Sequence, residues 1–194
     1  MLLSRSNTFL LSASAFLLLV LVSSTVQAQY QLLQTFPGLT CSGKAMVQVY
    51  TPSSLCKASN CTTNVKTYVG DYSASTTCTT TIPLSPKVGE YMILSYQDSK
   101  CSGNPSSVSI IALDTCIPAA NMTYGSVMYK GCKSVVTYKD QNCKTEDTTV
   151  PNANVDCVFG LSLQCSGAAE FMLRGSTGIV VSVMIAVLMM IFYL

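Results

Sequence analysis

Tyr91–Gly103, with the sequence YMILSYQDSKCSG, decides the fold of this chain. The first half, YMILSY, is a run of apolar and β-favouring side chains that is typical of a buried strand. The second half, QDSKCSG, combines Asp, Ser and Gly, which form turns, with a cysteine. Together these features predict a small β-rich unit that is closed by a disulfide.

The same arrangement occurs three times. An aromatic residue stands five positions before a cysteine in each copy, which predicts an internal repeat of strand, turn, cysteine and second extended stretch. Asp98 and Asp140 recur at matched places in two of the turns, and we expect each side chain to bond the backbone of its own turn. The three aromatic and cysteine pairs are Phe36 and Cys41, Tyr96 and Cys101, and Tyr138 and Cys143.

Short runs rich in Val, Ile, Thr and Tyr are separated by Gly, Pro, Asn and Asp, which favours strands over helices. No segment of 29–166 keeps a helical period over a dozen residues. We therefore expect an all-β fold, a small disulfide-rich and β-sandwich-like ectodomain, with a tight hairpin connection at Tyr129–Lys133. The strand-like runs are Ala45–Tyr50, Asn64–Val69, Tyr91–Tyr96, Val108–Leu113, Ser126–Tyr129 and Ser134–Tyr138.

The chain has ten cysteines and no histidine, and the cysteines have no C-x-x-C spacing. An even count in a secreted chain predicts five disulfides, whereas zinc binding or a reactive thiol would need ligand spacings or a His partner that the sequence lacks. Sequence alone does not select one pairing. The disulfide candidates are Cys41, Cys56, Cys61, Cys78, Cys101, Cys116, Cys132, Cys143, Cys157 and Cys165.

Cysteine spacing favours three local loops. The first cysteine of each repeat is followed by another cysteine 14 or 15 residues later, which would close a loop worth about 3 kcal/mol of unfolded-state entropy. These pairs are Cys41 with Cys56, Cys101 with Cys116, and Cys143 with Cys157. The Pro-containing segment TTTIPLSP at 79–86 then permits two modules, 29–82 with four cysteines and 83–166 with six.

The two ends of the chain are apolar. Arg5, the run Phe9–Val22 and the small-residue site Val26–Ala28 predict a signal peptide at 1–28. At the other end, Ser166 and Gly167 begin a small-residue site, followed by a spacer of about ten residues and an apolar tail that ends the chain at Leu194. This layout predicts attachment of a glycosylphosphatidylinositol (GPI) lipid at Ser166 or Gly167, with 167–194 removed as a propeptide.

A single-pass transmembrane helix over 178–194 is the alternative reading of the C-terminal run. Its length is at the short limit for a span, and no Lys or Arg follows it on what would be the cytoplasmic side. Asn60-Cys61-Thr62 and Asn121-Met122-Thr123 fit the acceptor pattern for N-glycosylation, which predicts glycans at Asn60 and Asn121 in a secreted chain.

Charge and residue inventory limit the function. The formal net charge is +2 and no run of like charge occurs, so we expect no nucleic-acid partner. Without histidine, and without a sequence pattern for a nucleophile, a carboxylate pair or a metal site, we expect no catalytic residues, no metal, no cofactor and no enzymatic activity.

The layout resembles that of small cysteine-rich, GPI-anchored surface glycoproteins, and the unit Tyr96-x-Asp98-x-x-Cys101-Ser102-Gly103 resembles repeats in surface proteins of amoeboid protists. The resemblance itself implies no established activity. From the layout of the chain we expect a lipoprotein on the extracellular face of the plasma membrane that binds an extracellular protein or glycan as a recognition or adhesion module. A structural or protective surface coat is the alternative, and an inhibitor or enzyme is a third reading for which the sequence shows no reactive loop.

Overall fold

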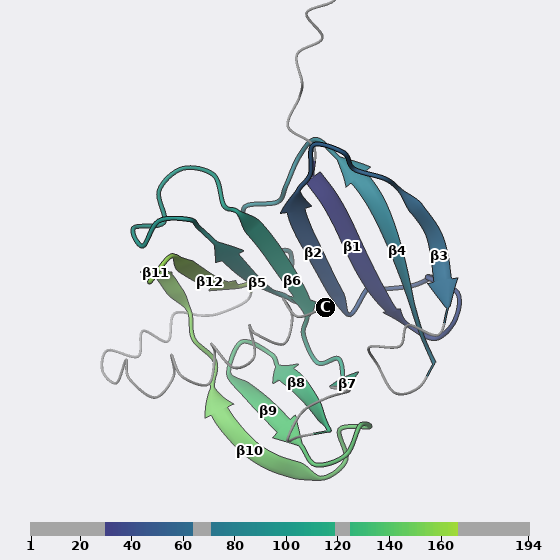
Figure 1. The fold of residues 1–194 in the computed structure, drawn as a ribbon. Coiled ribbons are helices and arrows are strands. Elements are labelled where there is room, and N and C mark those ends of the chain that lie inside the picture. The colour runs from purple at the N-terminus through teal and green to yellow at the C-terminus, as the bar shows by residue number, and fades with distance from the viewer. Residues whose placement is uncertain (1–29, 64–70, 119–124, 167–194) are drawn as a thin grey trace, which may run out of the picture.

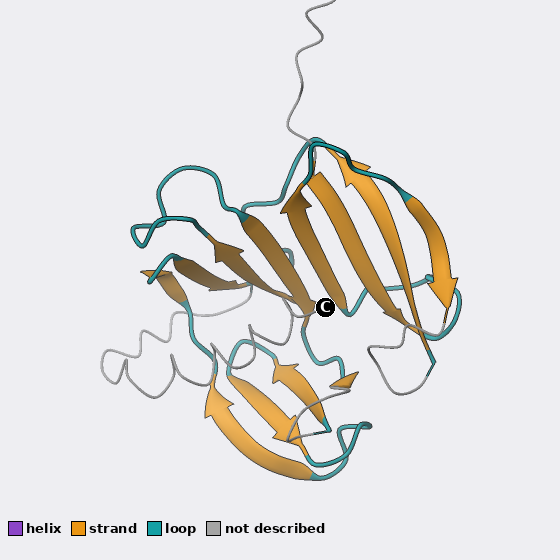
Figure 2. Ribbon diagram, in the orientation of Figure 1, coloured by secondary structure: helices purple, strands orange, loops and turns teal. Residues whose placement is uncertain are grey.

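In a computed structural model, which describes residues 30–63, 71–118 and 125–166, the chain forms two antiparallel sheets (Figures 1 and 2). No helix occurs within those ranges, and the expected all-β, disulfide-rich fold is confirmed. The eight-stranded sheet has the order β11 (Val155–Val158), β12 (Leu161–Cys165), β5 (Glu90–Ser95), β6 (Ser107–Ala112), β2 (Val47–Pro52), β1 (Tyr30–Pro37), β4 (Tyr72–Thr79), β3 (Ser59–Thr63). The four-stranded sheet has the order β10 (Glu146–Pro151), β9 (Ser134–Tyr138), β8 (Ser126–Lys130), β7 (Ile117–Pro118).

The apolar runs in the sequence correspond to β2, β5, β6, β8 and β9. The expected connection at Tyr129–Lys133 is also present, because β8 and β9 pair directly and the Lys133 amide donates to the Lys130 carbonyl at 3.3 Å. Gly131 has φ 54° in this turn, a conformation that glycine adopts without strain. The run Asn64–Val69, like the signal peptide, Asn121, Gly167 and the C-terminal tail, lies outside the described residues.

The main core lies between the two sheets. Successive residues of β5 point to opposite faces, so Tyr91 and Ile93 face the small sheet and Met92 and Leu94 face away from it. Tyr91 packs against Tyr129 of β8, with ring centroids 5.0 Å apart. On the outer face, Ile82 packs against the second cluster, to which Met92 and Leu94 belong. The large sheet is therefore covered on both faces near its centre.

All ten cysteines form disulfides, with Cα atoms 5.7 to 5.9 Å apart within each pair. The three local pairs that spacing favoured are wrong. Each turn cysteine lies at one end of its hairpin and bonds a cysteine in or beside a strand of a different hairpin, which sequence distance does not reveal. The pairs are Cys41–Cys61, Cys56–Cys78, Cys101–Cys157, Cys116–Cys143 and Cys132–Cys165.

The segments 29–82 and 83–166 share one sheet. No disulfide joins a cysteine of the first segment to one of the second. However, β2 pairs with β6 in register, with Val47 opposite Ile111 and Tyr50 opposite Val108, so hydrogen bonding continues across the boundary. The two cysteine groups thus close separately within a single continuous sheet.

Candidate interaction surface

The large sheet has two ends that differ in what they carry. Strand register places Tyr30, Pro52 and Thr79 at one end, together with Ser95 and Leu161. We call this the loop end, because it carries the connections 53–58, 96–106 and 159–160. The opposite end is the Ser166 end, where β12 finishes opposite the start of β5. In Figure 1 the 96–106 connection extends away from the small sheet.

Ser166, one of the two residues predicted to receive a lipid, is fixed at its end of the sheet. Its amide donates to the Glu90 carbonyl at 3.2 Å, and its hydroxyl donates to the Lys87 carbonyl. The preceding residue, Cys165, is bonded to Cys132 of the small sheet. Thus the last described residue leaves the fold from a position held by two strands and a disulfide.

Two large apolar side chains are exposed at the loop end. Leu55 is 89% exposed in the 53–58 connection, and Phe159 is 79% exposed in the turn between β11 and β12. Sequence reasoning missed both residues. Two signals could have identified them: an apolar residue inside the polar cluster TPSSLCK, and a Phe-Gly pair between two short strand-like runs.

The backbone around Phe159 is fixed by the neighbouring connection. The Tyr96 amide donates to the Gly160 carbonyl at 2.7 Å, and Cys157 is bonded to Cys101 in the 96–106 connection. A Cβ atom on Gly160 would lie 2.8 Å from the Asp98 carbonyl oxygen, so a residue with a side chain does not fit at this position. Phe159 itself has φ 48°, unusual for an aromatic residue. The turn therefore holds the Phe159 backbone in a defined position, with the side chain exposed.

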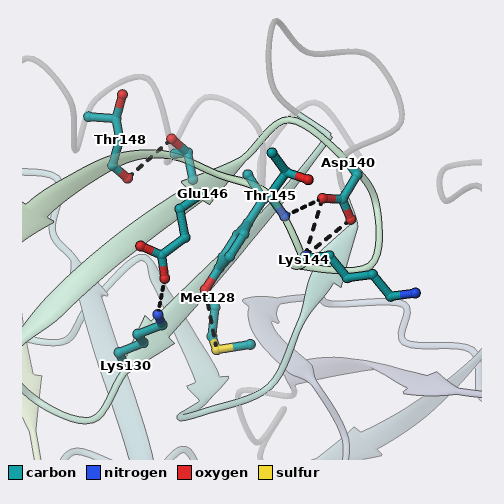
Figure 3. Close-up of polar contacts among 9 residues, drawn as sticks. Met128, Lys130, Asp140, Lys144, Thr145, Glu146 and Thr148 are labelled. Atoms are coloured by element: carbon teal, nitrogen blue, oxygen red, sulfur yellow. Dashed lines mark hydrogen bonds and ion pairs between the residues drawn. The ribbon is translucent and has the colours of Figure 1, made fainter.

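The aspartate turns form as the sequence predicts. Asp98 Oδ1 accepts from the Lys100 and Ser102 amides at 2.8 and 3.2 Å, and Asp140 Oδ1 accepts from the amides two and four residues later at the same distances. Figure 3 shows the bonds from the Lys144 and Thr145 amides to the Asp140 carboxylate. The Ser102 hydroxyl bond, followed by the amide bonds, lowers the pKa of Asp98. The Thr145 amide bond is the main cause that lowers the pKa of Asp140. Both carboxylates stabilise turns and do not face a common site.

The first cysteines of the three repeat copies share one backbone conformation. Cys41, Cys101 and Cys143 have φ of 47°, 54° and 55°, in the left-handed region that non-glycine residues rarely adopt. In the first copy, where no aspartate occurs, the Cys41 amide donates to the Ser73 hydroxyl at 2.8 Å instead. A disulfide on each of these residues fixes the connection to its neighbouring hairpin.

Asn60 lies on β3, the edge strand of the large sheet, and it is exposed. Its neighbour Cys61 is bonded to Cys41, and Thr62 of the acceptor pattern is exposed as well. The position is near the middle of the sheet's length, because Ser59 stands opposite Thr76 and Thr62 stands opposite Ala74. The Asn60 side chain is accessible to solvent, and its glycosylation stays a prediction.

Within 30–63, 71–118 and 125–166, no three His, Cys, Asp or Glu side chains are grouped so that they could hold a metal ion. No helix in the described part of the chain has the length and apolar character needed to cross a membrane. Comparison with protein-family models, curated proteins and solved structures gives no match.

Proposed function

We propose that the mature protein is a non-enzymatic recognition or adhesion module on the outer face of the plasma membrane, attached through a GPI lipid at Ser166 or Gly167. Five disulfides are typical of an extracellular or secreted protein, because the cytosol keeps thiols reduced. The residue layout of the C-terminus supports the lipid, and Ser166 lies at the edge of the fold, where a following segment can leave it.

The observation that carries the proposal is the separation of Ser166 from Phe159 and Leu55, which lie at the opposite end of the sheet. The sheet is about 25 Å long, taking the eight residues of β1 at about 3.3 Å each. A lipid at one end holds that end near the bilayer, so Phe159 and Leu55 at the other end face outward. Aromatic side chains, Phe among them, are enriched at protein interfaces because each buries a large apolar area.

The partner that we propose is an extracellular protein or glycan, and the membrane contact is through the lipid alone. A small surface around Phe159 gives weak binding for each copy. Many anchored copies in a fluid membrane would raise the overall affinity by avidity. Recognition is therefore expected between surfaces that carry many copies, and monomeric affinity is expected to be low.

The lipid is tested on cells that express the full chain with an epitope inserted after residue 29. Phosphatidylinositol-specific phospholipase C is expected to release the epitope into the medium, with the chain ending at Ser166 or Gly167 by mass spectrometry. Retention on the membrane after treatment, with 178–194 still present, would refute the lipid and favour the transmembrane alternative.

Recognition is tested by aggregation of the same cells with each other and with untransfected cells. Phe159→Asn is the informative variant, because asparagine tolerates positive φ, so the turn should remain folded while the ring is lost. Val88→Asn is the matched control, since Val88 is 93% exposed but lies in the turn at the Ser166 end. We expect only Phe159→Asn to reduce aggregation, at equal surface expression. Absence of aggregation and of glycan-array binding by the native chain would favour the surface coat.

A further inference from the structure

The three hairpins that contain the turn cysteines are built alike. We call them the cysteine-turn hairpins; they are β1–β2, β5–β6 and β9–β10. In each, the cysteine follows the last paired residue of the first strand by five or six positions. The innermost cross-strand pairs are Thr35 with Val47, Ser95 with Ser107, and Tyr138 with Glu146, and in β9–β10 a register shift separates this pair from the next one.

Each cysteine-turn hairpin has a second hairpin beside it, which we call the outer hairpin. The outer hairpins are β3–β4, β7–β8 and β11–β12, and each follows a cysteine-turn hairpin in the chain. In space, the second strand of an outer hairpin always pairs with the first strand of a cysteine-turn hairpin: β4 with β1, β12 with β5, and β8 with β9. The strand orders β2-β1-β4-β3, β6-β5-β12-β11 and β10-β9-β8-β7 are therefore equivalent.

The equivalence extends to residue positions. Cys78 in β4 stands opposite Gln31, and Cys165 in β12 stands opposite Tyr91, sixty residues after Gln31. The aromatic residue of the repeat also meets a serine of the outer hairpin twice, as Phe36 opposite Ser73 and Tyr138 opposite Ser126 (one pair in each sheet). Such agreement goes beyond strand order alone.

We propose that the chain is three copies of one four-stranded unit, in which the second and third copies have exchanged their outer hairpins. The first copy, β1–β4, pairs its two hairpins with each other. The second copy, β5–β8, gives β7–β8 to the small sheet, and the third, β9–β12, gives β11–β12 to the large sheet. The two sheets are thereby interlocked within one chain (Figure 1).

The disulfides follow the exchange. In the first copy, Cys41 of the turn bonds Cys61 in β3 of the same copy. In the exchanged copies the turn cysteine bonds the outer hairpin of the other copy, as Cys101 with Cys157 and Cys116 with Cys143. Without exchange, the equivalent bonds would be Cys101–Cys116 and Cys143–Cys157, two of the pairs that sequence spacing favours.

The length of the links between hairpins explains the exchange. For an outer hairpin to pair within its own copy, the link before it must run from one edge strand of the four-stranded unit to the other, as from β2 to β3. This distance is three strand spacings, or about 14 Å, and the link must also pass around the ends of the two strands between them. The link 53–58 reaches about 24 Å when extended, but 113–116 reaches about 17 Å and 152–154 only about 14 Å. The third copy has no length to spare, so its outer hairpin joins the other sheet.

Both short links are fixed between the sheets. The Tyr91 hydroxyl donates to the Ala153 carbonyl at 2.8 Å, and the Asn152 amide donates to the Lys133 carbonyl at 2.8 Å. In the other link, the Asp114 amide donates to the Tyr129 carbonyl at 2.8 Å, and Asp114 Oδ1 accepts from the Gly131 amide. The exchange is therefore built into the core.

The first test is a disulfide map of the native chain, obtained by proteolysis without reduction and mass spectrometry, before and after refolding in a glutathione buffer. The two disulfide arrangements contain equal numbers of bonds, so a catalytic thiolate interconverts them with no net oxidation. We expect peptides joined through Cys101–Cys157 and Cys116–Cys143 to exceed the local pairs at least tenfold in both samples. A map with Cys101–Cys116 and Cys143–Cys157 would overturn the exchange.

The second test lengthens the links. Gly-Ser-Gly-Ser inserted after Thr115 and again after Ala153 gives both links more reach than 53–58 has, and the local pairs are then expected to appear. The same insertion after Ser53 is the matched control, which should leave Cys41–Cys61 unchanged. If the lengthened chain keeps only the exchanged pairs, link length is not the cause. If it fails to fold, the native map alone decides whether the exchange exists.

Discussion

Cys132–Cys165 is the one disulfide of the five that joins the two sheets, because Cys132 lies in the β8–β9 turn and Cys165 ends β12. Replacing both residues, Cys132→Ser with Cys165→Ser, leaves the sheets joined by their common core and by the links 113–116 and 152–154. We expect this double variant to remain folded but to unfold at a clearly lower denaturant concentration and temperature.

The magnitude follows from the loop that the bridge closes. With a sequence separation of 33, the chain-entropy relation gives about 3.7 kcal/mol at 25 °C. For a domain of this size, that loss lowers the midpoint of thermal unfolding by about 10–15 °C. The matched control is Cys56→Ser with Cys78→Ser, whose separation of 22 gives about 3.4 kcal/mol and whose bridge lies entirely in the first copy.

The assay is urea unfolding without reductant, followed by tyrosine fluorescence, with the free energy of unfolding and its slope fitted for each variant. Both variants should lose similar free energy, since the two loops are of similar length. A loss below about 1 kcal/mol for Cys132→Ser with Cys165→Ser would contradict the loop-entropy reasoning. It would mean that the Cys101–Cys157 and Cys116–Cys143 bridges already restrict the same part of the unfolded chain.

Three further results are expected. Tyr91→Phe should cost about 1 kcal/mol in urea unfolding, because the buried hydroxyl donates to the Ala153 carbonyl; unchanged stability of this variant would contradict that bond. The native protein should also lose stability as the pH rises above 10.0, because burial raises the pKa of Tyr91 in the folded state. Gly125→Ala should cost about 1–3 kcal/mol, because its Cβ would lie 2.5 Å from the Asp140 carbonyl carbon. Gly103→Ala meets open space and should cost about 1 kcal/mol for its positive φ; a larger loss for Gly103→Ala than for Gly125→Ala would contradict this comparison. The carboxyl of Asp140 should titrate below 3.8 by NMR, and its contribution to stability should be present above that pH and fade as the pH falls through its lowered folded-state pKa; Asp140→Asn should abolish this fading.

The strands that sequence reasoning identified are those with apolar side chains on both faces. β5 and β6 are buried between the small sheet and the segment containing Ile82, so each reads as a continuous apolar run. β4 and β10 were missed, because their sequences YSASTTCT and EDTTVP are mainly polar; β4 is mostly half-buried and β10 mostly exposed. Their place is set by hydrogen bonds to β1 and β9, which no local pattern records.

The aspartate turns and the number of disulfides, in contrast, could be predicted from the sequence, because they depend on nearby residues and on the even count of cysteines. The Asp98 side chain bonds amides two and four residues away, so the residues that define the turn are adjacent in the chain. Disulfide pairing depends instead on which outer hairpin lies beside each turn. Because spacing is preserved when hairpins are exchanged, Cys101 and Cys116 keep a local distance in sequence while bonding residues elsewhere. Phe159 was missed because its exposure depends on that same placement.

The exchange has a mechanical consequence for the proposed function. Phe159 and Ser166 stand at the two ends of β12, so tension between a bound partner and the lipid would run along one strand. That strand is paired with β5 along its whole length and is held beside the small sheet through Cys165. The exposed turn and the proposed lipid attachment site are thus connected by β12, a strand of 5 residues. Force can therefore pass along β12 without unfolding of either sheet. The role of the three-copy core is to hold this strand in place.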